Sequence, residues 1–176
     1  MSCSLRVGGY ELDEAITRYL RLEHQLAIGS QTAEAIKIAI GSAVASDSEE
    51  VSEVRGRHLI TGLPTEVLLR SGEVRAAIQA PLSEIVQAIK DTLERTPPEL
   101  TGDIARDGIL LAGGGTLLRG FSSLLAAETG LPVVAASSPL TCVVTGSGEA
   151  LDHFDQLGPS GRTRRRYARS EPREVS

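Results

Sequence analysis

The chain has 176 residues, a length that fits one ordinary domain or two small lobes. Hydrophobic residues make up 41% of it, enough for a core, but only 3% are aromatic and tryptophan is absent, so the core must be aliphatic. The net charge of −5 argues against general nucleic-acid binding by the folded part, and no apolar stretch approaches the roughly 20 residues that span a bilayer.

Cysteine and histidine usage indicates no redox or metal site. Cys3 and Cys142 are too few for a disulfide framework and lack metal-binding spacing, and we expect Cys142 to be a small buried residue. His24, His58 and His153 are dispersed, so each is expected on the surface or packed. The N-terminus lacks a signal-peptide pattern, so we expect a cytoplasmic protein with reduced thiols.

The first third of the chain predicts two helices and a loop. Helical spacing over residues 11–27 predicts a helix whose apolar side carries Leu12, Ile16, Leu20 and Leu26. Thr32 can cap a second helix over residues 33–40, which Gly41 ends. Residues 44–52 are polar and acidic, which is typical of a loop.

The middle of the chain predicts a strand pair and a long helix. Residues 54–69 mix β-branched and charged side chains around a break at 62–64, which indicates two strands joined by a turn. Pro81 interrupts the helical stripe that follows, so we expect a kink or two abutting helices before the stop at 96–98. The stripe consists of Val74, Ile78, Leu82, Ile85, Val86, Ile89 and Leu93.

The last third alternates strands and helices. We expect a helical turn over 99–104, a strand over 108–112, a helix over 116–129, a strand over 131–136 and a helix over 139–151. This alternation predicts an α/β architecture.

The C-terminal tail, residues 157–176, is rich in glycine, serine, proline and arginine and is expected to be disordered. It carries six arginines against two glutamates, so the rest of the chain is more acidic than the whole. Such a tail can bind anionic lipid or nucleic acid, although a solvated, unstructured end is the commoner outcome.

Two short patterns could carry a ligand. The triplet Gly113, Gly114 and Gly115 between a strand and a helix gives backbone that a flat ligand can touch, or a tight turn for strand–helix packing. Glu34 and Lys37 share a helix face and could contact a ribose and a base; spacing alone favours a plain ion pair between them in water. Asp13 and Asp152 are expected to cap or solubilise their helices, and no phosphate-cradling Gly-Lys-Ser/Thr loop is present.

Six stretches together point to one family: VGGYELDEAI (7–16), TAEAIKIAIGSA (32–43), EVRGRHLITGLP (53–64), LERTPPEL (93–100), GILLAGGGTLLRG (108–120) and ETGLPVVAASSPLTCVVTG (128–146). In order and spacing they resemble the bacterial actin-like cell-shape proteins MreB and Mbl. The resemblance covers residues 5–155, nearly everything but the tail.

The resemblance implies an α/β fold of the actin-like ATPase (ribonuclease H-like) class, truncated to an incomplete second lobe. That lobe is expected over residues 5–156, with a small α+β subdomain inserted at roughly 24–68. The first lobe and the second lobe's phosphate hairpin are expected to be missing. Their loss would expose an edge at a strand following Leu5 and at the strand 108–112, and exposed edges invite pairing with another chain.

The resemblance also implies the half of a nucleotide site that contacts adenosine. The matching residues are Glu34 and Lys37, for ribose and base, and Gly113, Gly114, Gly115 and Thr116, for the adenosine-motif loop. ATP is expected to bind weakly through this half alone, and neither Mg²⁺ nor a catalytic residue is expected. Phosphoryl transfer depends on positioned phosphates and metal, so hydrolysis by this chain alone is not expected. Tyr10 departs from the family, which usually has aspartate there.

The leading hypothesis is therefore a truncated MreB-like protein in cell-shape and cell-wall morphogenesis. It would bind or modulate filaments of full-length MreB or Mbl, or cell-wall morphogenesis proteins, and could also self-associate. The alternatives are an ATPase half completed in trans by a separate first lobe, a weak adenine-nucleotide-sensing or purely structural module, and a degenerate fragment. We expect no specific nucleic acid as a partner. Membrane association is expected only indirectly or through the tail.

Overall fold

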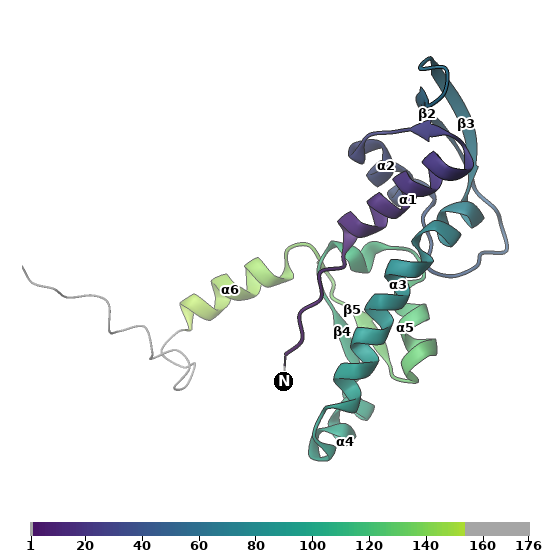
Figure 1. The fold of residues 1–176 in the computed structure, drawn as a ribbon. Coiled ribbons are helices and arrows are strands. Elements are labelled where there is room, and N and C mark those ends of the chain that lie inside the picture. The colour runs from purple at the N-terminus through teal and green to yellow at the C-terminus, as the bar shows by residue number, and fades with distance from the viewer. Residues whose placement is uncertain (1, 154–176) are drawn as a thin grey trace, which may run out of the picture.

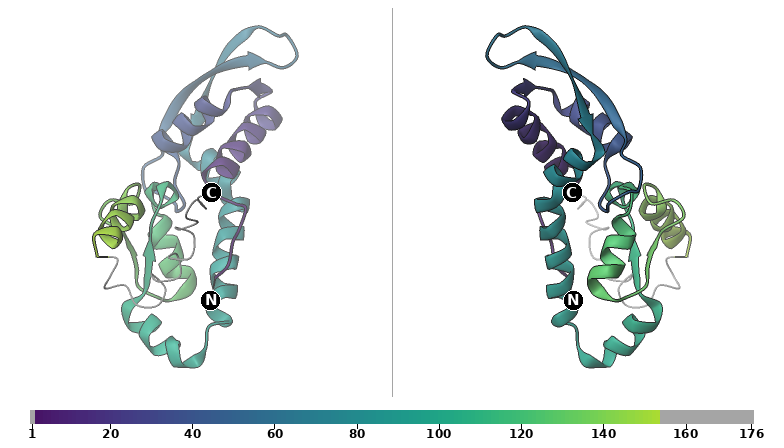
Figure 2. Two further views of the ribbon diagram at one scale, coloured as in Figure 1. Left: turned by 90° about the vertical axis from the view of Figure 1, so that its left-hand side faces the viewer. Right: turned by 90° about the vertical axis from the view of Figure 1, so that its right-hand side faces the viewer.

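The structure is a computed structural model that describes residues 2–153, so the tail predicted over 157–176 lies outside the described residues. Figures 1 and 2 show an elongated molecule. The hairpin of β2 (Val51–His58) and β3 (Pro64–Arg70) forms one end, and helix α4 (Pro98–Asp107) forms the other.

Helix α1 (Gly9–Glu23) packs with the apolar side that the spacing predicted, because Leu12, Ile16 and Leu20 are buried. It ends four residues before the predicted end at residue 27. Gln25 adopts a left-handed φ of 51°, which turns the chain out of the helix and into strand β1 (Leu26–Ala27). Leu26 is buried as predicted, but from a strand rather than from the helix.

A three-stranded antiparallel sheet in the order β1-β2-β3 follows, and it contains the strand pair predicted over residues 54–69. Val54 lies opposite Val67 across β2 and β3, and Leu26 lies opposite His58 across β1 and β2. Helix α2 (Ser30–Ile40) packs against α1 and β2. It begins before the predicted start at residue 33 because Gly29, not Thr32, occupies the N-cap.

Helix α3 (Ser71–Glu94) is one continuous helix through Pro81, so two abutting helices do not form. The predicted stripe holds, since α3 buries Val74, Ile78, Leu82 and Val86. The helix ends just before the predicted stop at 96–98, and α4 starts at Pro98, a position where proline has no hydrogen bond to lose.

A second sheet consists of the parallel strands β4 (Ile109–Leu111) and β5 (Val133–Ala135). Helix α5 (Phe121–Thr129) packs against β5 and lies beside α3, as both figures show. The buried hydrophobic residues of the three-stranded sheet and of α1, α2, α3 and α5 form one cluster, and the partly buried Leu111 and Val133 of the second sheet pack against it. Apart from Phe121 that cluster is aliphatic, as the composition predicted.

Helix α5 packs against one face of the β4–β5 sheet, and within residues 2–153 no element covers the opposite face. Leu110 and Val134 point to it and are 72% and 58% exposed; we call these two residues the outer sheet face. Helix α6 (Cys142–Asp152) buries no residue and stands away from the body in Figure 1. Parallel sheets are normally covered on both faces, so this exposed apolar face is unusual.

The predicted strand after Leu5 does not form. Residues 2–8 belong to no strand, and Leu5 and Val7 line an apolar hollow of about 350 Å³ beside Ile85 and Ile89 of α3. A strand needs ladder hydrogen bonds to a neighbour, and residues 2–7 make none to a described strand, although Ile109 of β4 lines the same hollow. The open edge predicted at 108–112 is present, since β4 pairs with β5 alone among the described strands.

The carboxylate of Glu73 joins the start of α3 to the end of α1. Its Oε2 accepts the Arg70 N–H at 2.9 Å, and its Oε1 lies 2.8 Å from His24 Nε2 and accepts the Tyr19 hydroxyl at 3.2 Å. Burial raises the pKa of Glu73, but the hydrogen bonds from Arg70, His24 and Tyr19 outweigh it, so the pKa lies below its ordinary value. His24 is therefore a packed histidine, one of the two expected alternatives.

The Glu73→Gln substitution should remove stabilisation that the ionised carboxylate provides, about 1–2 kcal/mol at neutral pH. Because the folded-state pKa is lowered, this contribution is present above the ordinary value of 4.5 and disappears as pH falls through the folded-state value. Urea unfolding followed by circular dichroism should show a steeper loss of wild-type stability below about pH 4.5 than in the variant. Glu84→Gln, an exposed change on the same helix, should keep the wild-type slope. Equal slopes for wild type and Glu73→Gln would contradict this assignment.

Candidate functional site

Helix α2 carries Glu34 and Lys37 on one face because they lie three positions apart. Both residues line a pocket of about 540 Å³, together with Gly114 and Gly115 of the glycine triplet. Its other walls include the backbone of Gly9 and Gly41 and the side chains of Leu12, Ile38, Leu117, Arg119 and Leu140. Four of the six residues predicted as nucleotide contacts therefore meet at one pocket, while Gly113 and Thr116 do not line it.

Gly113 and Thr116 instead shape the loop that follows β4. Gly113 has φ +94°, a conformation nearly confined to glycine, and its N–H donates to the Pro139 carbonyl at 2.7 Å. Its own carbonyl accepts the N–H of Thr116 at 3.2 Å and the Thr116 hydroxyl at 2.8 Å. These bonds hold the turn, and they leave Gly114 and Gly115 at the pocket.

The helix predicted over residues 116–129 begins later than expected. Residues Gly114–Leu117 form a short 3-10 helix, η1, and α5 starts only at Phe121. Gly120 separates the two with a left-handed φ of 72°, which cannot continue a helix. A Cβ at this position would also overlap the side chain of Val44, so glycine is required where the two segments approach.

Lys37 pairs with Asp13 of α1, and the plain ion pair with Glu34 does not form. Lys37 Nζ lies 2.8 Å from Asp13 Oδ1 and 3.0 Å from Oδ2, and it donates to the Gly9 carbonyl at 3.0 Å. The two side chains are only 15% and 13% exposed. Asp13, which was expected to cap or solubilise its helix, is therefore half of a largely buried ion pair. The signal was available in the sequence, because Asp13 lies three residues before Ile16 on the buried side of the helix.

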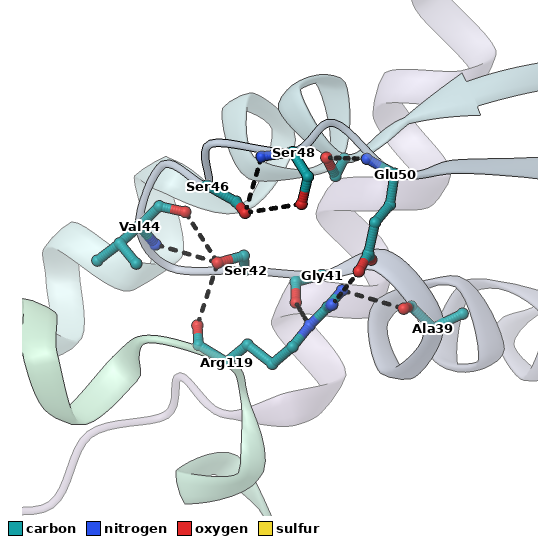
Figure 3. Close-up of polar contacts among 9 residues, drawn as sticks. Ala39, Gly41, Ser42, Val44, Ser46, Ser48, Glu50 and Arg119 are labelled. Carbon is teal, nitrogen blue, oxygen red and sulfur yellow. Dashed lines mark hydrogen bonds and ion pairs between the residues drawn. The ribbon is translucent and has the colours of Figure 1, made fainter.

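Arg119 connects the glycine loop to the end of α2, as Figure 3 shows. Its Nε donates to the Gly41 carbonyl at 3.1 Å, Nη2 donates to the Ala39 carbonyl at 3.0 Å, and Nη1 lies 2.8 Å from Glu50 Oε1. Its own carbonyl accepts the Ala43 N–H at 2.8 Å. The last carbonyls of a helix lack partners within the helix, so a cation is favourable at this end. Sequence reasoning missed Arg119, and no local pattern identifies it.

The pocket has the size and the hydrogen-bond acceptor that a small polar ligand with a flat ring requires. The pocket volume lies in the range of small-molecule sites, and the exposed Glu34 carboxylate can accept hydrogen bonds from sugar hydroxyls. A Cβ at Gly115 would meet no atom within 4 Å, so the backbone there is open to a flat ring. Both cations at the pocket, Lys37 and Arg119, are engaged by protein acceptors. Residues 2–153 hold no group of three or more histidine, cysteine or acidic side chains placed to bind a metal.

The remaining candidate side chains, Cys142 and His58, contact backbone groups of the protein itself. Cys142, expected to be buried, is only partly buried at the start of α6, because that helix stands away from the core; its Sγ lies 3.5 Å from the Pro139 carbonyl. His58 Nδ1 accepts the N–H groups of Ile60 and Thr61 and so shapes the hairpin tip. None of the helices in the described part of the chain has the length and apolar character needed to cross a bilayer.

Comparison with known proteins gives consistent matches. A family model described as MreB/Mbl protein matches residues 1–159. The chain is 49% identical over 157 residues to the cell shape-determining protein MreB of Escherichia coli (strain K12) and 42% identical over 156 residues to the cell shape-determining protein Mbl of Bacillus subtilis (strain 168). Each alignment covers 89% of this chain but 45% and 47% of the relatives. The chain therefore spans about half the length of the curated relatives it matches.

Solved structures agree in fold. MreB5 of Spiroplasma citri bound to ADP is similar with a TM-score of 0.83 and 37% identity over 86% of this chain and 46% of that chain. The same protein bound to AMPPNP gives a TM-score of 0.82. The MamK double helical filament gives a TM-score of 0.60 at 23% identity over 74% of this chain and 40% of that chain, which supports the fold alone. The described residues thus have an actin-like α/β fold.

Arg119→Ala should lower the free energy of unfolding by about 1–2 kcal/mol, because it leaves the last carbonyls of α2 without their donor. Arg119→Lys should recover less than half of this loss, since one ammonium cannot reach the three acceptors that the guanidinium reaches. Chemical denaturation monitored by circular dichroism measures both.

The matched control is Arg106→Ala on α4, because Arg106 bonds to its near neighbours Asp103 and Asp107 at the surface and should leave the unfolding midpoint unchanged. If Arg119→Ala proves as stable as this control, the proposed role of Arg119 in holding α2 is wrong.

Proposed function

The chain belongs to the MreB/Mbl family, and on that premise we propose that it acts in cell-shape maintenance by binding and modulating actin-like filaments, without hydrolysing ATP on its own. Two relatives that are named cell shape-determining proteins support a role in this process. The partners are full-length MreB or Mbl subunits, and the binding surface is the part of the fold that the described residues leave bare.

The observation that carries this proposal is the outer sheet face. Leu110 and Val134 expose apolar surface on a parallel sheet of only two strands, with an unpaired β4 edge beside it. A two-stranded sheet is marginal in water, and parallel strands normally have both faces covered. The exposed helix α6 adds Val143 and Leu151, which are 69% and 72% exposed. A protein partner that covers this surface removes apolar side chains from water.

The proposal that the chain does not hydrolyse ATP rests on how its cations are used. Phosphoryl transfer is catalysed mainly by positioning and by charges that neutralise the phosphates. At the pocket, Lys37 is held by Asp13, and Arg119 is held by Glu50 and the last carbonyls of α2. The alternative of an ATPase half completed in trans requires a second polypeptide to supply the phosphate and metal contacts.

The pocket favours a second candidate function, weak binding of an adenine nucleoside or nucleotide. Glu34, Lys37, Gly114 and Gly115 meet there, and MreB5 of Spiroplasma citri, a structural neighbour, binds ADP and AMPPNP. Nucleoside binding at this pocket would let the chain respond to adenine nucleotides while it contacts a filament.

Co-sedimentation with full-length Escherichia coli MreB filaments tests the filament proposal. The wild-type chain should pellet with the filaments, and Leu110→Glu should weaken binding at least tenfold, because it places a charge on the outer sheet face. Leu22→Glu on α1 is the matched control, since Leu22 is 71% exposed against 72% for Leu110. It should bind like wild type.

Absence of wild-type binding, or equal binding by both variants, would contradict the filament proposal. Self-association of the chain in analytical ultracentrifugation, lost in Leu110→Glu, would assign the same face to a second copy instead. ATP hydrolysis that appears only after a separate first lobe is added would favour the enzyme completed in trans.

Isothermal titration with adenosine tests the pocket. Glu34→Ala and Gly115→Ala should each weaken binding at least tenfold, the first by removing a hydrogen-bond acceptor and the second by placing a methyl group in open space at the pocket wall. Neither change should alter the unfolding midpoint, because Glu34 is exposed and the new methyl meets no protein atom within 4 Å.

Gly102→Ala on α4 is the matched glycine control, since a Cβ there also meets nothing within 4 Å. It should bind adenosine as wild type does. Wild-type affinity in both Glu34→Ala and Gly115→Ala would place adenosine elsewhere on the protein.

A further inference from the structure

The loop between α2 and β2 presents serine hydroxyls beside acidic side chains. Residues 45–50 belong to no helix or strand and are all exposed. The hydroxyl oxygens of Ser46 and Ser48 lie 3.4 Å apart, and Figure 3 shows both on the inner side of the loop. Glu49 and Glu50 directly follow Ser48. A serine followed by carboxylates on an exposed loop is a substrate that an acid-directed protein kinase can recognise by charge.

The same serines line a polar hollow of about 360 Å³ that also contains two guanidinium groups. The hollow lies between the loop, the segment 119–120 and the start of α3. Its charged lining residues are Asp47, Glu50, Arg75 and Arg119. The guanidinium of Arg119 is engaged by Glu50 and by the last carbonyls of α2, so Arg75 is the cation of the hollow that can take a further partner.

Arg75 lies near the start of α3 and is partly buried, and it makes no hydrogen bond or ion pair with any residue that the structure describes. A Cβ built at Gly72 would lie 3.1 Å from Glu49 Oε1 and 3.8 Å from Arg75 Nη2. The loop beside Ser48 therefore passes close to this guanidinium, while Glu49 itself pairs with Arg70 at 3.0 Å. A guanidinium presents five donors in a fixed fork that matches the oxygens of a phosphate.

We propose that Ser48 is a phosphorylation site and that Arg75 binds its phosphate. In a protein kinase, Ser48 Oγ attacks the γ-phosphorus of ATP. The Oγ–P bond forms, the bond from that phosphorus to the bridging oxygen of ADP breaks, and the hydroxyl proton passes to a base of the kinase. The group added to the serine carries about −1.5 to −2 charges at pH 7 and can accept charge-assisted hydrogen bonds from Arg75.

An attached phosphate suits this hollow better than a free anion does. Asp47 and Glu50 line it and Glu49 lies beside it, so their carboxylates repel an anion that arrives from solution. A phosphate bonded to Ser48 is instead held close to Arg75 by the chain, which corresponds to a high effective concentration. The acidic side chains that oppose a free anion are the same ones that favour recognition by the kinase.

The modification would add a contact between the loop and α3. In the unmodified chain the loop meets the start of α3 where Ser71 and Glu50 exchange hydrogen bonds, and Arg75 takes no part. The loop begins where α2 ends, so the phosphate would act next to the contact that Arg119 makes with that helix. This regulation uses neither the outer sheet face nor the adenosine pocket.

The first experiment places phosphoserine at position 48 of the full chain by genetic code expansion and follows the phosphate by ³¹P NMR during a pH titration. A neighbouring cation favours the dianion, so the second pKa of the phosphate should be at least about half a unit lower in the wild-type background than in Arg75→Gln. Phosphorylation should also raise the midpoint of thermal unfolding in the wild-type background only. Without phosphate, Arg75→Gln should unfold like wild type, because Arg75 has no described partner to lose.

Two matched controls separate a specific contact from a general effect of charge. Arg57→Gln removes the same charge from an exposed position of β2 and should leave the pKa of the phosphate at position 48 unchanged. Phosphoserine placed at position 147 is exposed on α6, which stands away from the body, and its pKa should not respond to Arg75→Gln.

The source of the phosphate is tested on the unmodified protein. Peptide mass spectrometry of the chain isolated from its own cells, growing and starved, should find phosphate on Ser48. Inorganic phosphate at millimolar concentration, added to the unmodified chain, should leave the amide NMR signals of Ser48 and Arg75 in place.

Equal phosphate pKa values in the wild-type and Arg75→Gln backgrounds, or an equal rise in Arg57→Gln, would overturn the role of Arg75. An unmodified Ser48 in both growing and starved cells would overturn the modification. Saturable shifts caused by inorganic phosphate would assign the hollow to a free anion instead. Because no arm uses filaments or adenosine, the filament and pocket proposals stand or fall separately.

Discussion

The contact between the Arg119 guanidinium and the last turn of α2 holds together the two parts of the chain that form the pocket. Arg119 lies 78 and 80 residues from its acceptors Gly41 and Ala39. Helix α2 brings Glu34 and Lys37, and the segment that ends at Arg119 brings the glycines. A planar group with five donors on three nitrogens can reach several carbonyls of one helix end and a carboxylate at once, whereas the three donors of an ammonium share one nitrogen.

The two cations at the pocket are paired within the protein without a ligand, whereas in the part of the chain that the structure describes no ion pair engages the Glu34 carboxylate. Asp13 neutralises Lys37 on one side, and Glu50 pairs with Arg119 on the other. A buried charge without its partner is costly, so a pocket that relied on a ligand to neutralise Lys37 would be unstable when empty. Pairing within the protein holds Lys37 and Arg119 in place before a ligand binds, which lowers the ordering cost of binding.

Local patterns predicted most of the helices and strands but not the contacts between them. The apolar stripe from Val74 to Leu93 predicted α3 because helical periodicity is a short-range signal. The early end of α1, strand β1 and the late start of α5 were missed because a left-handed residue at position 25 and Gly120 redirect the backbone, and periodicity does not record φ. At the site, the spacing of Glu34 and Lys37 placed them on one helix face, and the family resemblance joined them to the glycines. Arg119 is set by tertiary contacts about 80 residues away, which no local window contains.

The position of helix α3 between the two sheets affects how the protein unfolds. Glu73 at its start bonds to His24 next to α1, and Lys90 near its end lies 2.6 Å from Glu128 of α5. The same helix therefore closes the core beneath both sheets. The β4–β5 sheet is too small to be stable alone, so it depends on the core that α5 and α3 complete. We therefore expect the two sheets to unfold together, with the smaller sheet lost when the larger one is lost.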